Sequence, residues 1–238
     1  GPTMMHLFEE YAKGTDPVKL GKLGKLYGRG VSNGCAMRVA AAGLCNPGNI
    51  DETIKTTITM TKVSHGTQYA YAGACATACA ISEAMMPNAT IDSVLHASVV
   101  GAKQGENIGL KEARKATGLL FLPKLLKAIE CVYAADNEDE ASVLIERYVG
   151  NSGDIRESVP AAIGLFAANL GDPYKTIKAG ANIGGDTDTI ACIAGMIAGA
   201  YGGFSKLPSK MWEVFKNANP LLDMEWAAKE LTLIAKKS

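Results

Sequence analysis

The sequence has few aromatic residues, no excess of charge of either sign and no long apolar run. Aromatic residues make up 6% of the 238 residues, and 24 Lys and Arg residues balance 24 Asp and Glu residues. A net charge of zero offers no overall attraction to nucleic acid or to an anionic membrane. Gly, Asn or charged residues interrupt the most apolar stretches, and no signal peptide is recognisable. We therefore expect a cytoplasmic protein with no membrane partner and no nucleic-acid partner.

The sequence also lacks the cysteine patterns that are typical of zinc sites and redox motifs. Its six cysteines form no Cys-x-x-Cys pair and lie in apolar, alanine-rich surroundings. Cysteines of this kind in a reducing compartment favour buried thiols over disulfides. We predict buried, free thiols at Cys35, Cys45, Cys75, Cys79, Cys131 and Cys192.

Alternation of β-branched and polar residues is scarce, whereas alanine-rich segments at helical spacing are abundant. These patterns predict an all-α fold, and 238 residues suit one large domain over residues 1–238. A helix is predicted from Thr90 to Val100, followed by a polar surface helix or loop over residues 103–118. Another is predicted to open at Ser158, with Pro160 in its first turn. Two amphipathic helices are expected after Pro208.

The most informative stretch runs from Asn182 to Ile190. Two glycines precede Asp186-Thr-Asp-Thr189, and a helix of small residues follows. Two aspartates two positions apart point to different sides of a helix, so they converge only where a loop turns into one. Clustered hard oxygens at such a corner suit Mg²⁺, Mn²⁺ or Ca²⁺ better than zinc. An ordinary helix cap explains one carboxylate but does not require two, so we favour a metal site.

The helix that follows this stretch carries a stripe of small side chains. Such a stripe allows another helix to approach closely and to brace the loop. Its members are Ala191, Ala194, Gly195, Ala198 and Gly199.

A second glycine-rich stretch, residues 28–34, precedes a helix predicted from Cys35. Its glycine spacing matches neither a dinucleotide fingerprint nor a P-loop. Ser32, Asn33 and Gly34 would form either a plain helix cap or an anion site at a helix start. His65 is predicted to lie just before another long helix, either as a capping or packing residue or in a ligand loop.

Four stretches together resemble the ADP-ribosylglycohydrolase family of all-α dinuclear-metal hydrolases. They are Ser-Asn-Gly-Cys-Ala-Met-Arg (32–38), Val-Ser-His-Gly (63–66), Ser-Val-Pro-Ala-Ala (158–162) and Asn-Ile-Gly-Gly-Asp-Thr-Asp-Thr-Ile-Ala (182–191). The resemblance spans roughly residues 7–203, and the last motif is specific to the family. It implies a compact domain of helices packed at steep angles, which removes ADP-ribose from proteins.

The resemblance also implies a role for each matching residue. Asp186, Asp188 and Thr189 would bind one or both Mg²⁺ ions, with Mn²⁺ as a possible substitute, and the two aspartates would be catalytic. The substrate-binding residues would be Ser32, Asn33, Gly34, His65, Asn182 and Gly184. The metals would orient the ribose hydroxyls and activate a water that hydrolyses the glycosidic bond.

This chain departs from the family pattern in one respect. Family members begin with a Gly-Asp-x-x-Gly helix and a Thr-Asp-Asp-Thr motif that completes the metal site, and neither motif is present. We therefore expect an amino-terminally truncated member of the family. Two functions are compatible with this pattern. The first is hydrolysis of an ADP-ribosylated protein or a related ADP-ribosyl compound. The second is non-catalytic binding of ADP-ribose or a nucleotide, or a structural role like that of the related lens crystallins.

Overall fold

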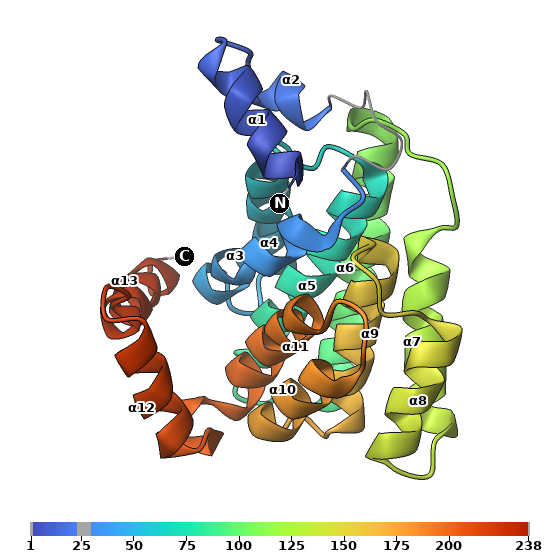
Figure 1. Ribbon diagram of the computed structural model, residues 1–238, viewed down its shortest axis with the longest axis vertical. Coiled ribbons are helices and arrows are strands. Elements are labelled where there is room, and N and C mark those ends of the chain that lie inside the picture. The colour runs from blue at the N-terminus through green and yellow to red at the C-terminus, as the bar shows by residue number, and fades with distance from the viewer. Residues whose placement is uncertain (1, 23–29, 238) are drawn as a thin grey trace.

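The computed structural model describes residues 2–22 and 30–237, and within these ranges the chain is helical, without a β-sheet (Figure 1). Only two isolated β-bridges occur there, Ser32 with Asp154 and Thr67 with Arg114. The all-α prediction is therefore confirmed. The helices are α1 (Pro2–Ala12), α2 (Pro17–Gly21), α3 (Ala40–Cys45), α4 (Ile50–Thr61), α5 (Gln68–Ala84), α6 (Ile91–Glu112), α7 (Phe121–Ala134), α8 (Glu138–Tyr148), α9 (Ile155–Ala168), α10 (Pro173–Asn182), α11 (Thr187–Gly202), α12 (Ser209–Ala218) and α13 (Met224–Ala235), with 3-10 helices η1 (Asn33–Arg38) and η2 (Phe204–Lys206).

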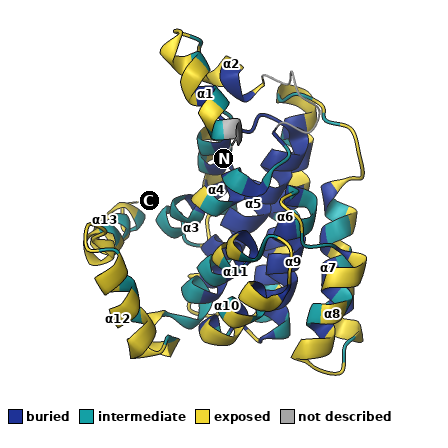
Figure 2. Cartoon of the chain, viewed as in Figure 1, coloured by how far each residue is buried: buried dark blue, intermediate teal, exposed yellow. Residues whose placement is uncertain are grey.

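Helix α5 forms the centre of the molecule. Nearly every one of its side chains is buried, and α4, α6, α9 and α11 pack around it (Figure 2). A helix that is apolar and small on all sides can be buried on all sides. Thr67 caps its first turn by accepting a hydrogen bond from the Ala70 amide. The core of the molecule is thus built around one alanine-rich helix, which follows directly after His65.

Helix α6 is longer than the sequence predicted. It continues through Lys103 to Glu112, where a polar surface segment was expected. Gly101, Gly105 and Gly109 lie on one face of this extension, and each backs directly onto the α5 backbone. Glycine at this spacing allows two helices to approach within backbone contact. Burial of that face against α5 therefore stabilises a helix whose outer side is polar.

Helix α9 begins earlier than predicted. Asp154 accepts a hydrogen bond from the Arg156 amide and caps the helix, so the first helical residue is Ile155 rather than Ser158. Pro160 consequently lies inside the helix and not in its first turn. The capping aspartate, four residues before the predicted start, explains the difference.

The pair α10 and α11 brings the Asn182–Ile190 stretch into the body of the molecule. A Cβ atom added to Gly180 of α10 would lie 2.7 Å from the Ala191 Cα atom, and Gly195 faces Ile177 of α10. The predicted close approach of a second helix to the small-residue stripe is therefore confirmed. This contact braces the loop between the two helices.

The two carboxy-terminal helices form a separate arm, defined here as residues 204–237. Neither α12 nor α13 buries any side chain fully, and α13 contacts the body at α3 (Figure 1). The prediction of two amphipathic helices after Pro208 is confirmed. None of the helices in the two described ranges is long and apolar enough to cross a membrane.

None of the six cysteines, all of which lie in the described ranges, forms a disulfide, as predicted. Cys35, Cys75, Cys79 and Cys131 are buried. The prediction of burial is wrong for Cys192, which is exposed on α11, and for Cys45, which is half-buried at the end of α3. Both lie on helices whose other faces supply the core contacts.

Candidate functional site

The loop between α10 and α11 is built by two glycines and one asparagine. Gly184 and Gly185 have φ angles of 85° and 63°, a region that favours glycine. The Asp186 amide donates to the Asn151 carbonyl at 2.8 Å, and Asn151 Nδ2 donates to the Ile183 carbonyl at 3.0 Å. A Cβ atom on Gly185 would collide with the Asn151 carbonyl. The segment before α9 therefore holds the loop that carries Asp186.

Asp186 meets Asn33 across a sequence separation of 153 residues. Asn33 Nδ2 donates to Asp186 Oδ2 at 2.5 Å and to Ser158 Oγ at 3.1 Å. Asn33 is 6% exposed, and its backbone amide donates to the Gly153 carbonyl at 3.1 Å. The fold thus brings together side chains from three of the four stretches that carry the family resemblance.

Asp186 does not serve as an ordinary helix cap. It occupies the cap position of α11, yet its carboxylate accepts no hydrogen bond from the first turn. Asp188 is exposed in that turn. Thr189 is buried, and its hydroxyl lies 3.6 Å from Met37 Sδ. The carboxylates of Asp186 and Asp188 therefore keep oxygen atoms that the helix start does not use.

These donors fit one hard cation in part. Mg²⁺ is commonly held by one or two carboxylates together with waters and substrate oxygens, and Asp186 and Asp188 provide two carboxylates. Within the described residues, however, no group of three or more His, Cys, Asp or Glu side chains is placed to hold a metal ion. The donor chemistry suits Mg²⁺, and further ligands would have to be water or substrate.

His65 is buried beside Ser32. It is 1% exposed, and its two ring nitrogens lie 3.0 Å from Ser32 Oγ and 2.9 Å from Ser64 Oγ. Arg38 Nη2 donates to Ser64 Oγ at 2.6 Å. Burial lowers the pKa of His65 to about 4, and the positive charge of Arg38 adds to this effect. His65 is therefore a neutral imidazole at pH 7, with both nitrogens engaged.

The predicted helix start at residues 32–35 differs in kind from the expectation. The segment Asn33–Arg38 is a 3-10 helix, and the α-helix begins only at Ala40. The Ser32 side chain makes no cap hydrogen bond and turns to His65 instead. Part of the glycine-rich stretch, at Gly28 and Arg29, lies outside the described residues.

Asn182 is exposed at the end of α10. Its side chain donates to the Lys178 carbonyl within α10 at 2.7 Å. It lines a cavity of about 580 Å³ between α8 and α10, together with Glu138, Ser142 and Lys175. Gly184 lies in the loop beside Asn151. The roles of Asn182 and Gly184 in binding substrate stay predictions.

Four residues of the site received no role from the sequence: Arg38, Ser64, Asn151 and Ser158. Ser158 belongs to a stretch that carries the family resemblance, yet nothing local marks its hydroxyl as a partner of Asn33. Asn151 follows Gly150 in a loop that composition alone describes as a turn. Arg38 and Ser64 adjoin predicted residues, and only their contact in space links them.

Most of this chain is similar in sequence to known proteins. The sequence profile of the ADP-ribosylglycohydrolase family matches residues 1–237. The uncharacterized protein YegU of Escherichia coli K12 is 34% identical over 187 residues, 77% of this chain and 54% of that protein. ADP-ribosylhydrolase ARH3 of Homo sapiens is 30% identical over 207 residues, 76% of this chain and 52% of that protein. ARH3 of Xenopus tropicalis is 28% identical over 225 residues, 87% and 63% of the two chains. The chain thus spans between about half and two thirds of the length of these relatives.

Proposed function

The chain belongs to the ADP-ribosylglycohydrolase family, and on this basis we propose that it acts on ADP-ribosyl compounds. The proposed reaction is Mg²⁺-dependent hydrolysis of the glycosidic bond between ADP-ribose and a protein side chain or another leaving group. The names of the ARH3 relatives support this class of substrate. The relation to YegU leaves the leaving group open, because no activity is attached to that name.

One observation carries the proposal. Asn33 donates to both Asp186 and Ser158, so the predicted ligand loop and the predicted metal loop meet at one buried amide. A charge-assisted hydrogen bond of this kind fixes the orientation of a carboxylate. Asp186 Oδ2 is thereby held in place, and the other oxygen of the carboxylate can face a ligand.

Asp186 and Asp188 would hold the Mg²⁺ ion, with Thr189 behind them in the first turn of α11. When bound, the ion would supply positive charge that orients ribose hydroxyls and favours the ionised form of a water molecule. Two ions are expected from the family resemblance. The two carboxylates of this chain would serve one of them, together with water and substrate oxygens.

Ser32 and His65 would act on the ligand as a pair. The hydroxyl of Ser32 is oriented by a neutral imidazole, whose other nitrogen is held by Ser64. We infer that His65 is a positioning residue that acts through Ser32, because neither of its nitrogens is unengaged. The Ser32 hydroxyl, which is half-buried, is the group of this pair that can reach a phosphate or ribose oxygen.

A second function, binding of ADP-ribose without hydrolysis, is favoured by one other observation. The described residues hold no group of three or more His, Cys, Asp or Glu side chains placed for a metal. Both functions would use the contact between Asn33 and Asp186, so binding of ADP-ribose alone does not distinguish them. Binding and hydrolysis therefore have to be measured separately.

The test is calorimetric titration with ADP-ribose, with and without Mg²⁺, followed by an assay for release of ADP-ribose from ADP-ribosylated protein. We expect binding to strengthen with Mg²⁺ and to weaken at least tenfold in Asp186→Ala, because that variant loses a metal ligand and leaves the Asn33 side-chain amide with Ser158 as its remaining acceptor. Asp223→Ala is the matched control, since Asp223 caps α13 in the arm.

The outcomes separate the two functions. Mg²⁺-dependent binding with release of ADP-ribose supports the hydrolase, and binding without release supports the binding protein. Absence of binding under both conditions would overturn both. Equal affinity in Asp186→Ala and the unsubstituted protein would show that ligand does not use this site.

A further inference from the structure

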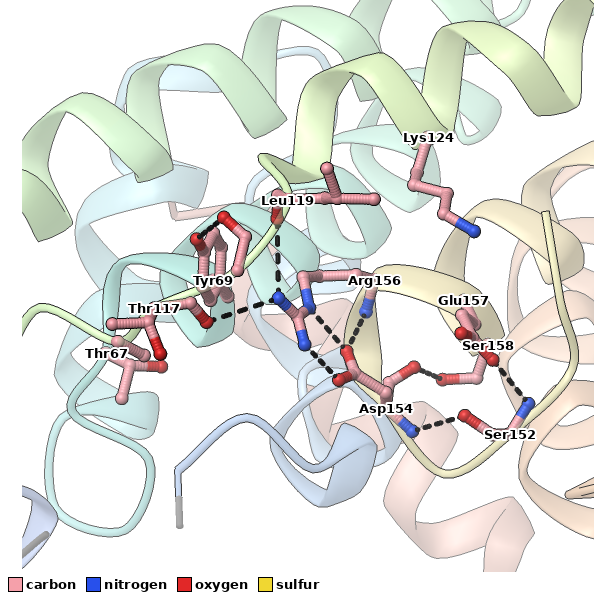
Figure 3. A network of polar contacts seen from close by, with 12 residues as sticks. Thr67, Tyr69, Thr117, Leu119, Lys124, Ser152, Asp154, Arg156, Glu157 and Ser158 are labelled. Carbon is pink, nitrogen blue, oxygen red and sulfur yellow. Dashed lines mark hydrogen bonds and ion pairs between the residues drawn. The ribbon is translucent and has the colours of Figure 1, made fainter. Parts of the chain in front are cut away.

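The side chain of Arg156 joins three segments that are distant in sequence. It reaches from the first turn of α9 to Tyr69 of α5 and to the loop at residues 117–119 (Figure 3). Nothing in the family resemblance assigns it a role. Its side chain is 19% exposed, and its contact with Asp154 is partly shielded from water. Shielding of this kind makes ion pairs and charged hydrogen bonds stronger than at an open surface.

The first contact of Arg156 is with the residue that caps its own helix. Arg156 Nε donates to Asp154 Oδ1 at 2.9 Å, and Nη2 donates to Oδ2 at 2.5 Å. Oδ1 also accepts from the Arg156 backbone amide at 2.9 Å. A two-point contact between a guanidinium and a carboxylate fixes direction as well as distance. Asp154 is therefore held in one orientation by the residue two positions later.

The second set of contacts anchors the guanidinium from the other side. Its Cζ atom lies 4.7 Å from the centre of the Tyr69 ring, and Nη1 donates to the carbonyls of Thr117 at 3.5 Å and Leu119 at 3.4 Å. Tyr69 Oη donates to the Gly118 carbonyl at 2.8 Å. A Cβ atom on Gly118 would collide with Nη1, so glycine leaves the space that the guanidinium occupies.

Residues 153–155, which Arg156 holds through Asp154, are paired with residues 31–33 of the predicted ligand loop. The Ile155 amide donates to the Val31 carbonyl at 2.9 Å, and the Asn33 amide donates to the Gly153 carbonyl at 3.1 Å. Between them, Ser32 and Asp154 form an antiparallel bridge. The position of Asp154 thus determines the register of Ser32, because antiparallel pairing transmits position residue by residue.

A second path leads from Asp154 to the same asparagine. Ser158 Oγ donates to the Asp154 carbonyl at 3.1 Å, which leaves its lone pairs to accept from Asn33 Nδ2. Asn33 is therefore fixed by its backbone through Gly153 and by its side chain through Ser158. Both paths start at the capped end of α9.

We propose that Arg156 is a positioning residue: by linking Asp154 to Tyr69 and to the 117–119 loop through its own side chain, it acts as a clamp that sets the register of residues 31–33 and the direction of the Asn33 amide toward Asp186. The clamp itself follows from these contacts alone. Its consequence for a ligand rests on the proposed function, that is, on ADP-ribose as the occupant of this site.

The test measures amide hydrogen exchange by NMR in the full chain, together with calorimetric titration with ADP-ribose and Mg²⁺. The variants are Arg156→Met, Arg156→Lys and Asp154→Asn. Lys127→Met is the matched control, because Lys127 also lies over a tyrosine ring, 5.1 Å from the centre of Tyr148, and also pairs with a carboxylate, Glu130 at 2.8 Å. It lies on α7, outside the clamp.

In Arg156→Met we expect the protection of the Asn33 and Ile155 amides to fall about tenfold more than that of the α5 core amides, because only the pairing of 31–33 loses its support. Arg156→Lys should give a smaller loss, since a single ammonium reaches Asp154 without bridging to the loop carbonyls. Lys127→Met should leave both amides unchanged. The affinity for ADP-ribose should fall about tenfold in Arg156→Met and remain unchanged in the control.

Two results decide between a local clamp and a general stabilising role. Equal loss of protection at Asn33, Ile155 and the α5 amides would show that Arg156 stabilises the whole protein and not residues 31–33 in particular. That result would overturn the proposal. If Arg156→Met does not fold, Asp154→Asn and Arg156→Lys give the same comparison with smaller perturbations. Local loss of protection in a protein that does not bind ADP-ribose at all would support the clamp while overturning the proposed function.

Discussion

At the scale of single residues, His65 shows how burial determines chemistry. The sequence places this histidine before a helix, but its protonation state depends on the side chains that surround it in space. Burial and the charge of Arg38 lower its pKa to about 4, and hydrogen bonds to Ser32 and Ser64 occupy both nitrogens. Its role in the site is therefore that of a neutral, oriented partner and not of a proton donor near pH 7.

The depressed pKa of His65 predicts a pH dependence of stability. The unfolded chain takes up a proton near pH 6.5 and the folded one only near pH 4, so the free energy of unfolding is highest above pH 6.5 and falls as the pH drops toward 4. Between pH 7 and pH 4.5 the loss should be about 2 kcal/mol. Urea unfolding at the two pH values measures it.

The variant His65→Gln should lose about 2 kcal/mol less than the unsubstituted protein over the same interval, because glutamine does not titrate. The exposed His96→Gln serves as the control for removal of a histidine. The same pH dependence in His65→Gln and in the unsubstituted protein would contradict the assignment of the effect to His65.

At the scale of elements, the contact between α5 and α6 depends on glycine. A Cβ atom on Gly105 would lie 2.5 Å from the Tyr71 carbonyl oxygen and 3.0 Å from Cys75 Cβ. Both neighbours, a backbone oxygen and a Cβ atom, belong to a buried helix and have little freedom to move. The helix propensity of alanine is thus outweighed at this position by the geometry of the neighbour.

Gly105→Ala should therefore destabilise the protein by about 2 kcal/mol, since overpacking of this kind commonly costs 1–3 kcal/mol. Gly199→Ala on α11 is the matched control, because nothing lies within 4 Å of its added Cβ atom. That substitution should be neutral or stabilise by up to about 1 kcal/mol. Denaturation in urea distinguishes the two. A stabilising Gly105→Ala would mean that α5 and α6 are further apart than described.

At the scale of the whole molecule, the arm and the body differ in how they are held. The body buries α5 and most of α9, whereas α12 and α13 bury no side chain fully (Figure 2). Segments with few buried apolar contacts open more readily than cores. The arm also exposes large apolar side chains, among them Phe204, Met211, Val214, Leu221, Leu222, Met224, Trp226, Leu233 and Ile234.

Both tryptophans of the sequence, Trp212 and Trp226, lie in the arm. Tryptophan fluorescence therefore reports the arm alone, while far-ultraviolet circular dichroism reports all helices. We expect the fluorescence transition in urea to precede the main dichroism transition, because the arm can unfold without exposing the core. Trp212→Phe provides the control, leaving Trp226 as a single probe. Coincident transitions by both probes would show that arm and body unfold as one unit.

Local chemistry made the helix starts and the central motif predictable from the sequence. Thr90 caps the helix that was predicted to begin there, because a cap requires only a short polar side chain within three residues of an amide. The two glycines of Gly-Gly-Asp-Thr-Asp-Thr marked the loop before α11, because glycine readily adopts the positive φ angles found there. The stripe of small residues on α11 likewise predicted a close helix neighbour.

The extent of α6 and the partners within the site were decided only by tertiary packing. The polar residues after Val100 do not by themselves indicate a helix that packs against the core. The packing becomes evident only when Gly101, Gly105 and Gly109 are seen to contact the α5 backbone.

The sequence by itself determined an all-helical protein, the positions of most helix starts and the residues that carry the family resemblance. Only the folded chain brought Asn33 into contact with Asp186 and paired both ring nitrogens of His65 with serine hydroxyls. It also placed the Arg156 side chain between three segments. The physical reason is the distance along the sequence over which each kind of interaction acts. Capping, turns and helical periodicity act within about four residues along the chain, whereas these contacts join residues that are distant in sequence and become neighbours only through packing of the core.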